Sequence, residues 1–333
     1  MEKTLLMDEA PGPNAARTWP GGPAKSTAAA RLGLAAKIAV SAALLAFLSQ
    51  KVEWPAVGAR LSGATFGPMV GALALMIGLV FIAALRWRLL VQQSDVRMPI
   101  SVAVQLTFAG LFFGQVLPAT VGGDVVRGYL ACQRGLPWRE VVSGIVLDRI
   151  TALLGSLTLI LMGLPWLMTL VAGTPALLAF AAFASAALVC ALGTLLCIDL
   201  IPLPGWIARH PWIGSGLNLA RRVRTGLLSK AGIAALALSL VTHLTTVVVV
   251  VLIGKGLAVP VSLKAGFVVV PLAILAAAVP VSLNGWGVRE GVIVVGLALF
   301  GISSGDALLI SIMLGVGVIL SVLPGIVTWL TSR

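Results

Sequence analysis

The sequence predicts an all-α integral membrane protein, a polytopic helical bundle. Hydrophobic residues make up 59% of its 333 residues and charged residues only 10%, whereas a soluble globular domain carries roughly 25% charged residues. Several apolar runs approach the ~20 residues that a helix needs to span a bilayer. These runs are continuous rather than alternating, which excludes a transmembrane β-barrel.

The basic charge of +12 fits cytoplasmic loops that face anionic lipid headgroups, and we expect no nucleic acid partner. Cys132, Cys190 and Cys197 show neither CxxC nor metal-finger spacing, so we expect no metal. Residues 1–30 are rich in Pro, Gly, Ala and charge and lack the features of a secretory signal peptide. We expect them to form a disordered cytoplasmic tail, and residues 31–333 to form a single transmembrane domain.

The chain beyond the tail contains nine apolar segments, near Leu32–Ser49, Gly67–Leu85, Ile100–Leu117, Val141–Leu164, Pro175–Ile198, Ala231–Ile253, Lys264–Val279, Val288–Phe300 and Asp306–Leu330. The Lys and Arg residues indicate which of them cross, because cytoplasmic loops are enriched in these residues. If all segments cross, the connections place nine Lys and Arg inside and eleven outside. If Ile100–Arg134 and Lys264–Phe300 are re-entrant hairpins, the inside holds sixteen and the outside four. The charges therefore predict six crossing helices, two re-entrant hairpins and cytoplasmic termini.

This topology divides the chain into repeat 1, about residues 31–166, and repeat 2, about residues 174–331. The first hairpin enters from the cytoplasm and the second from outside, which is an inverted-topology repeat of the kind that many transporters use. Non-helical backbone at membrane depth must be covered by protein or water, and two hairpins that meet inside a bundle would supply that cover. The basic piece between the repeats, residues 199–230, is expected on the cytoplasmic side, either as a surface helix on anionic lipid or as a plain linker.

Two stretches carry the polar residues of the hairpins. Leu117–Arg127 reads LPATVGGDVVR and Val279–Glu290 reads VPVSLNGWGVRE. In each stretch an Arg follows a Pro by nine residues, a hydroxyl side chain stands two residues after the Pro, and glycines lie between. The corresponding pairs are Pro118 and Arg127 with Thr120, and Pro280 and Arg289 with Ser282. We interpret the two stretches as two copies of one motif, a hairpin break with charged residues beside it.

The first stretch is suited to binding an anion. Asp124 and Arg127 are three residues apart and share a helix face. They follow Gly122 and Gly123, where free backbone N–H groups and the positive end of a helix favour an anion. Arg127 can add a bidentate grip on phosphate. The alternative is an interfacial ion pair that caps the helix, with Arg127 extended toward water.

In the second stretch, Arg289 and Glu290 follow Gly285 and Gly287. Adjacent residues on a helix diverge, so we expect these two side chains not to pair with each other. Each can instead reach toward the first hairpin, and the alternative is that they mark the end of a loop.

Asp148 and Arg149 lie inside an apolar segment, where a charge costs roughly 2.5–3.5 kcal/mol and normally faces the bundle interior with a partner. We expect Asp148 to pair with Arg127 or Arg289, either in a functional site or in an ion pair that fixes the packing of the bundle.

Arg86 and Arg88, on either side of Trp87, are expected to anchor a helix at the membrane interface, with Arg86 facing a headgroup as the alternative. His243 is expected to be a packing histidine, with a proton relay as the alternative. Gly110 and Gly114 form a GxxxG pattern that favours close helix approach.

The PATVGGDVVR stretch, the LDR at Leu147–Arg149 and the PVSLNGWGVRE stretch resemble signatures of the lysylphosphatidylglycerol synthase transmembrane region family, also called the flippase-like domain. The likeness covers nearly the whole chain beyond the tail. In larger synthases of this kind, the region is linked to lipid translocation and a separate cytoplasmic domain makes the aminoacylated lipid. This chain ends at Arg333, directly after the last segment, so the resemblance implies a translocase-like protein without the synthase domain.

The family also includes proteins tied to polyprenyl-linked sugars and to hopanoid-type lipids, so the lipid stays open. The resemblance implies the following functional positions: Pro118, Gly122, Gly123, Asp124, Arg127, Asp148, Arg149, Pro280, Ser282, Gly285, Gly287, Arg289 and Glu290.

Together these patterns predict a lipid translocase of the bacterial cytoplasmic membrane, with Arg127 and Arg289 holding the phosphate of a phospholipid or polyprenyl-phosphate lipid. A membrane-embedded transferase, with Asp124 or Asp148 as its base, is one alternative, and a non-transporting subunit is another. The sequence has no P-loop, HExxH, dinucleotide Gly motif or Ser/His/Asp set, so we expect no cofactor and no nucleotide-driven pumping. The oligomeric state stays open.

Overall fold

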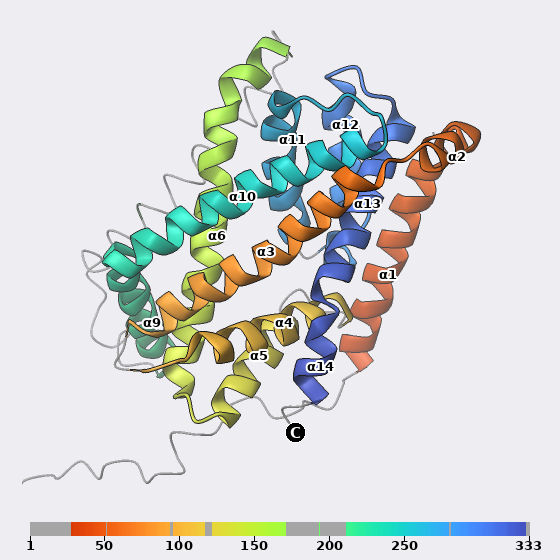
Figure 1. Cartoon of the computed structure of the whole chain (residues 1–333). Coiled ribbons are helices and arrows are strands. Elements are labelled where there is room, and N and C mark those ends of the chain that lie inside the picture. The colour runs from red at the N-terminus through yellow and green to blue at the C-terminus, as the bar shows by residue number, and fades with distance from the viewer. Residues whose placement is uncertain are drawn as a thin grey trace, which may run out of the picture.

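The computed structural model describes residues 28–50, 52–93, 96–116, 122–170, 193, 211–279 and 281–330, and within them it contains helices and no strand (Figure 1). The all-α class is therefore confirmed. The helices are α1 (Ala28–Ser49), α2 (Trp54–Ser62), α3 (Phe66–Val91), α4 (Ile100–Val116), α5 (Gly122–Gln133), α6 (Trp138–Leu170), α9 (Pro211–Leu228), α10 (Lys230–Gly256), α11 (Leu263–Ala278), the 3-10 turn η1 (Leu283–Gly285), α12 (Val288–Ala298), α13 (Ser304–Val322) and α14 (Pro324–Leu330).

Four of the described helical stretches are long and apolar enough to cross a membrane. They are α3, α6, α10, and α13 together with α14. The paired helices α1 and α2 make a fifth candidate, bent by 89° at the break between them. The remaining predicted crossing, Pro175–Ile198, lies outside the described residues except for Gly193. The chain is thus a multi-pass membrane protein, and the number of six crossings stays a prediction.

Helices α3 and α10 lie side by side in opposite directions through the middle of the molecule (Figure 1). At one end, the backbone N–H of Thr65 donates to the carbonyl oxygen of Gly256 at 2.8 Å. Further along the pair, Nη1 of Arg86 in α3 donates to Oγ of Ser239 in α10 at 3.0 Å. Since α3 belongs to the first predicted repeat and α10 to the second, their antiparallel packing is the arrangement that an inverted repeat requires.

Each predicted hairpin consists of two short helices that pack on each other. In the first, a Cβ built on Gly123 of α5 would lie 2.2 Å from the carbonyl oxygen of Gly110 and 2.9 Å from Cα of Gly114, both in α4. The GxxxG pattern thus marks a close backbone contact, as predicted. In the second, α11 packs on α12, and a Cβ on Gly285 would lie 2.5 Å from Cβ of Ala277. Glycine is required at both turns because any side chain would collide with the partner helix.

The tips of the two hairpins meet. Nδ2 of Asn284, in η1, donates to the carbonyl oxygen of Gln115, near the end of α4, at 3.1 Å. The neighbouring backbone N–H of Leu283 donates to Oγ of Ser41 in α1 at 2.8 Å. The break of the second hairpin is therefore joined both to α1 and to the first hairpin. The predicted break residues outside the described part of the chain are Pro118, Thr120 and Pro280.

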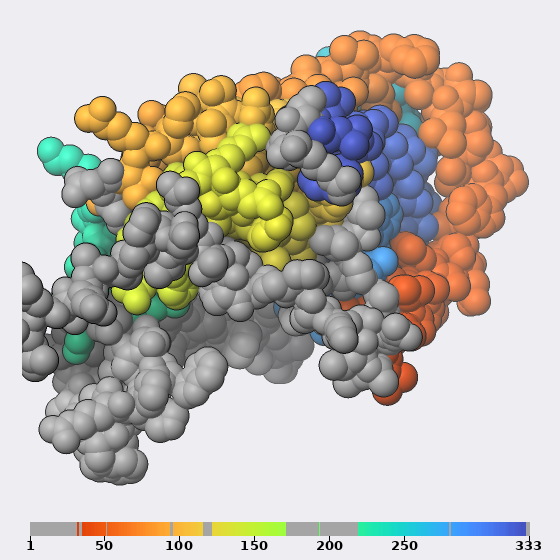
Figure 2. Space-filling view, turned by 90° about the horizontal axis from the view of Figure 1, so that it is seen from below, coloured from red at the N-terminus to blue at the C-terminus, as the bar shows by residue number. Residues whose placement is uncertain are grey.

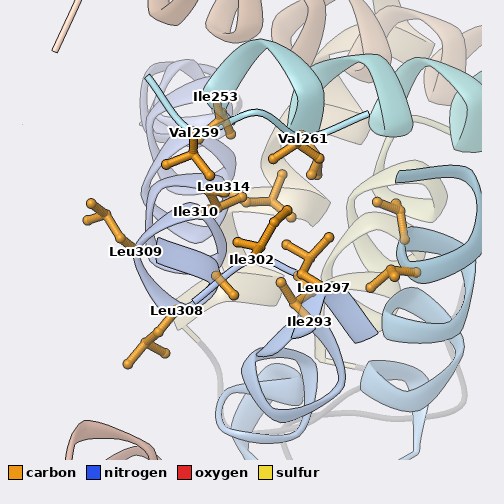
Figure 3. Close-up of a cluster of buried hydrophobic side chains, with 14 of the residues drawn as sticks. Ile253, Val259, Val261, Ile293, Leu297, Ile302, Leu308, Leu309, Ile310 and Leu314 are labelled. Atoms are coloured by element: carbon orange, nitrogen blue, oxygen red, sulfur yellow. The ribbon is translucent and has the colours of Figure 1, made fainter. Parts of the chain in front are cut away.

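The helices of both hairpins pack into apolar clusters. The larger cluster joins α11, α12 and α13 to the end of α10 (Figure 3); its labelled members are Ile253, Val259, Val261, Ile293, Leu297, Ile302, Leu308, Leu309, Ile310 and Leu314. A second cluster packs α4 and α5 against α3 and the start of α6, and its largest buried side chains include Trp87, Leu106 and Leu130.

The connections gather at two ends of the molecule. Helix α9, the α4–α5 hairpin and the end of α14 lie at one end, and α2 with the α10–α11 and α12–α13 connections lies at the other (Figure 1). Seen from the first end, the yellow surface of α5 lies beside the dark blue surface of α14 (Figure 2). This grouping agrees with the two sides predicted for the loops.

Helix α9 forms most of the described part of the basic piece between the repeats. Its Val223 and Leu227 are buried against Leu90 of α3 and Leu147 of α6, so these two apolar residues cover protein rather than lipid. Its Arg222 pairs with Glu140 at 3.5 Å. The helix is therefore docked on the bundle, and contact of its basic face with anionic lipid stays a prediction.

Candidate functional site

Five charged side chains form a continuous chain beside the first hairpin. Nη2 of Arg127 lies 3.0 Å from Oδ1 of Asp124 and 3.3 Å from Oδ2 of Asp148. The other oxygen of each carboxylate has a second partner: Nε of Arg149 donates to Asp124 at 2.6 Å, and Nε of Arg86 donates to Asp148 at 2.7 Å. We call these five residues the Arg127 network. The predicted pair of Asp148 with Arg127 is present, and the pair with Arg289 is not.

The Arg127 network runs from the surface into the protein. The side chain of Arg149 is 58% exposed, whereas Arg86, Asp124, Arg127 and Asp148 are buried. The alternative in which Arg127 extends toward water is wrong, because only 5% of the residue is exposed. Arg127 is turned inward by its two carboxylate partners and by the indole of Trp87, whose ring centre lies 4.5 Å from Cζ.

Arg86 is a member of this network that the sequence interpretation missed. An interface anchor was expected, but Arg86 is buried, and its Nη1 also donates to Oγ of Ser239 in α10 at 3.0 Å. The network therefore links α3, α5 and α6 to the second half of the chain. One signal was available in the sequence: the apolar residues 89–91 follow Arg86 and Arg88. Helix α3 does continue to Val91, so the charge of Arg86 stands inside the helix rather than beyond its end.

Glycines bring the network to its position. A Cβ on Gly110 of α4 would lie 2.9 Å from Cβ of Arg127, so the Arg127 side chain can leave α5 only because α4 has no side chain there. Gly122 and Gly123 open α5 and are buried. Asp124 lies in the first turn of the helix, where the positive end of the helix dipole favours a carboxylate.

A second cluster forms around Glu290, which is fully buried at 0% exposure. Its Oε2 accepts from the backbone N–H of Gly287 at 2.6 Å. Its Oε1 accepts from Nε of Arg289 at 3.0 Å and from Oγ of Ser311 in α13 at 3.3 Å. Cζ of Arg289 also lies 4.9 Å from the ring centre of Trp286. We call these five residues the Glu290 cluster.

The expectation that Arg289 and Glu290 do not pair, and that each reaches the first hairpin, is wrong. Glu290 turns back over the first turn of α12 to cap the N–H of Gly287, and the long Arg289 side chain folds onto the same carboxylate. Gly287 has φ of 88° and Gly285 has φ of 78°, which places this backbone in the region that glycine adopts without strain. Arg289 and Glu290 thus neutralise each other locally.

Two further features complete the site. Ser282 is 1% exposed and its Oγ is without a hydrogen-bond partner. A ring nitrogen of His243, Nε2, lies 2.9 Å from the carbonyl oxygen of Ala152, which fits the packing role. Within the described ranges, no three His, Cys, Asp or Glu side chains gather as a metal site.

A multi-helix apolar bundle with buried charge beside the breaks of two helical hairpins defines an integral membrane protein with a polar interior. The model of the lysylphosphatidylglycerol synthase TM region family matches residues 34–325 of this chain. The chain therefore belongs to that family, as its motifs indicated, and the matched range includes both the Arg127 network and the Glu290 cluster. No curated protein and no solved structure matches it.

Proposed function

We propose that the protein moves a phosphate-containing membrane lipid between the leaflets of the bacterial cytoplasmic membrane. The family to which it belongs supports a role with membrane lipid. The observation that carries the proposal is the charge of the Arg127 network. Its three guanidinium groups and two carboxylates leave one positive charge in excess, beside helices that are apolar enough to span a membrane. Such a charge needs a counter-ion, and lipid phosphate is the anion that a bilayer supplies.

The exposure of the network suggests the path of the headgroup. Arg149 is accessible and can capture a phosphate from outside the bundle, and Arg127 lies two ion pairs further in. The headgroup would move along these guanidinium groups while the acyl or polyprenyl tails remain in lipid. The Glu290 cluster lies in the second hairpin, which is joined to the first through Asn284. It would provide the corresponding guanidinium in the second half, that of Arg289, which is paired with Glu290 in this structure.

The proposal includes a topology in which the two hairpins are re-entrant and enter from opposite faces, with both termini cytoplasmic. The short paired helices, the antiparallel packing of α3 and α10 and the contact between the hairpin tips support it. Phosphate that reaches the junction from either face would meet the same set of groups, as in transporters built from inverted repeats.

Cysteine labelling tests this topology. In a chain whose native cysteines are replaced, Arg139→Cys, at the start of α6, is expected to react only with reagent on the cytoplasmic side. Ser304→Cys, at the start of α13, is expected to react only from outside. A membrane-impermeant maleimide applied to intact cells and to inverted vesicles measures both. If the two cysteines are labelled from the same side, the proposed topology is wrong.

Leaflet exchange in reconstituted vesicles tests the function. Vesicles with the wild-type chain are expected to move a fluorescent phospholipid or polyprenyl-phosphate lipid between leaflets, and Arg127→Ala and Arg289→Ala are expected to lower the rate at least about tenfold, a barrier increase of roughly 1.4 kcal/mol. Arg60→Gln is the matched control, because it removes one Arg from an Arg–Asp pair, with Asp306, in a different part of the fold. Translocation at the wild-type rate by both alanine variants would overturn the mechanism.

A further inference from the structure

We infer that Arg127 is an exchangeable anion site for a singly charged phosphodiester, and that Arg86 and Arg149 are positioning residues that retain the two carboxylates when the phosphodiester binds. This inference rests on the proposed function and specifies the chemistry of its substrate. It follows from how unevenly the three guanidinium groups of the Arg127 network hold their partners.

Arg127 is the weakly held member of the network. It contacts both carboxylates through the single nitrogen Nη2, at 3.0 Å and 3.3 Å. Arg149 and Arg86 each hold one carboxylate through Nε, at 2.6 Å and 2.7 Å. An anion that takes Nη2 of Arg127 therefore breaks the two longer contacts and leaves the two shorter ones. Neither Asp124 nor Asp148 loses its countercharge in this exchange.

Arg127 also has an unused donor. Its Nε–H is buried without a hydrogen-bond partner, and so is the indole Nε1–H of Trp87, on which the guanidinium stacks. A buried N–H without an acceptor costs free energy, and such groups are rare in folded proteins. Phosphate oxygens are suited to this site, because a guanidinium binds them through two parallel N–H donors, here Nε and Nη2. The Trp87 ring keeps the guanidinium in place while its carboxylate partners are exchanged.

The charge of the network selects the type of phosphate. One phosphodiester carries one negative charge and brings the three guanidinium groups and two carboxylates to neutrality. A doubly charged phosphomonoester would leave one negative charge in excess on a network of which only Arg149 is exposed. In a low-dielectric site this difference matters more than in water. The structure thus favours glycerophospholipids with a diester headgroup over terminal monophosphates.

The exchange makes and breaks only hydrogen bonds and ion pairs. The phosphodiester oxygens accept from Nε and Nη2 of Arg127, Asp124 stays with Arg149, and Asp148 stays with Arg86. Oγ of Ser239 holds the second nitrogen of Arg86 at 3.0 Å, so Arg86 keeps its orientation during the exchange. Release of the lipid restores the arrangement seen in this structure.

A charge series measured on the purified full-length protein tests the inference. The probes are short-chain phosphatidylglycerol and short-chain phosphatidic acid at about pH 8, above the second phosphate pKa of roughly 6, and binding is measured by calorimetry. Arg149→Gln makes the network neutral and is expected to weaken phosphatidylglycerol binding about tenfold or more. Asp124→Asn in the same chain restores the single excess charge and is expected to bring the affinity back to within about threefold of wild type.

The single variant Asp124→Asn distinguishes an effect of charge from a structural effect. It leaves two positive charges in excess and is expected to shift the preference toward phosphatidic acid, relative to phosphatidylglycerol, by about tenfold. A purely structural role for Asp124 would change both affinities alike. Arg60→Gln serves as the control and is expected to bind both probes as wild type does. An unchanged preference in Asp124→Asn, or no recovery in the double variant, would overturn the inference.

The binding series and the leaflet-exchange assay test the inference and the proposed function independently. Binding that follows the charge series without any translocation would support the anion site and contradict the proposed function. Translocation that depends on Arg127 while binding ignores the charge series would support the proposed function and contradict the exchange at Arg127.

Discussion

Gly123→Ala is expected to disrupt the first hairpin. The added Cβ would lie 2.2 Å from the carbonyl oxygen of Gly110 and 2.9 Å from Cα of Gly114. Both are backbone atoms, so α4 and α5 must move apart to accept it. Overpacking of this kind typically costs about 1–3 kcal/mol, and we expect the upper end of that range or beyond. Loss of lipid translocation should accompany it, because Arg127 is carried on the displaced helix.

Denaturant unfolding of the purified chain in detergent measures the effect of Gly123→Ala. Gly291→Ala in α12 is the matched control, since its Cβ would meet nothing within 4 Å. That substitution is expected to be neutral or to stabilise by up to ~1 kcal/mol, because alanine favours a helix more than glycine does. Equal midpoints for the two variants would show that the close contact between α4 and α5 contributes nothing.

Glu290→Ala is expected to destabilise the protein by about 3–5 kcal/mol, the usual cost of removing one partner from a buried ion pair. The change leaves Arg289 without its countercharge and removes the acceptor for the N–H of Gly287. Glu290→Gln is expected to cost less, because the amide oxygen can still accept one of these hydrogen bonds. The same denaturant titration measures the free energy of unfolding of each variant.

Glu140→Ala is the control for Glu290. It also removes a Glu from an Arg–Glu pair, but its partner Arg222 is 51% exposed and lies 3.5 Å away, so a loss of no more than about 1 kcal/mol is expected. Similar losses for Glu140→Ala and Glu290→Ala would mean that the Glu290 cluster is solvated and not buried.

Most of the fold follows from apolar runs and glycine patterns. Helices α4, α11 and α12 begin and end within about two residues of predicted segments, because Gly, Pro and charge interrupt the runs there. Helix α5 was expected only as part of the first hairpin, without bounds of its own. Helix α2 was not predicted, since Trp54–Ser62 is short and only weakly apolar. Its bend of 89° from α1 depends on packing against later parts of the chain, which local sequence does not report.

The pairing of charged side chains could be predicted where the spacing along a helix fixes their geometry. It could not be predicted where a long side chain can reach several partners. Asp124 and Arg127 pair because they are three residues apart on α5. Arg86 was misassigned, since an Arg beside a Trp near the end of an apolar run usually marks the interface. The pairing of Arg289 with Glu290 was missed because helical geometry separates adjacent Cβ atoms but does not limit the ends of flexible side chains.

The antiparallel pair α3 and α10 limits how the protein can change shape. A hydrogen bond from Thr65 to Gly256 ties the pair at one end, and Arg86 of α3 joins Ser239 of α10 further along. Sliding one helix past the other would break both links together. Large motions are therefore expected to be rotations of the outer helices about the α3–α10 pair. An intramolecular cross-link between α3 and α10 should leave the rate of lipid translocation unchanged.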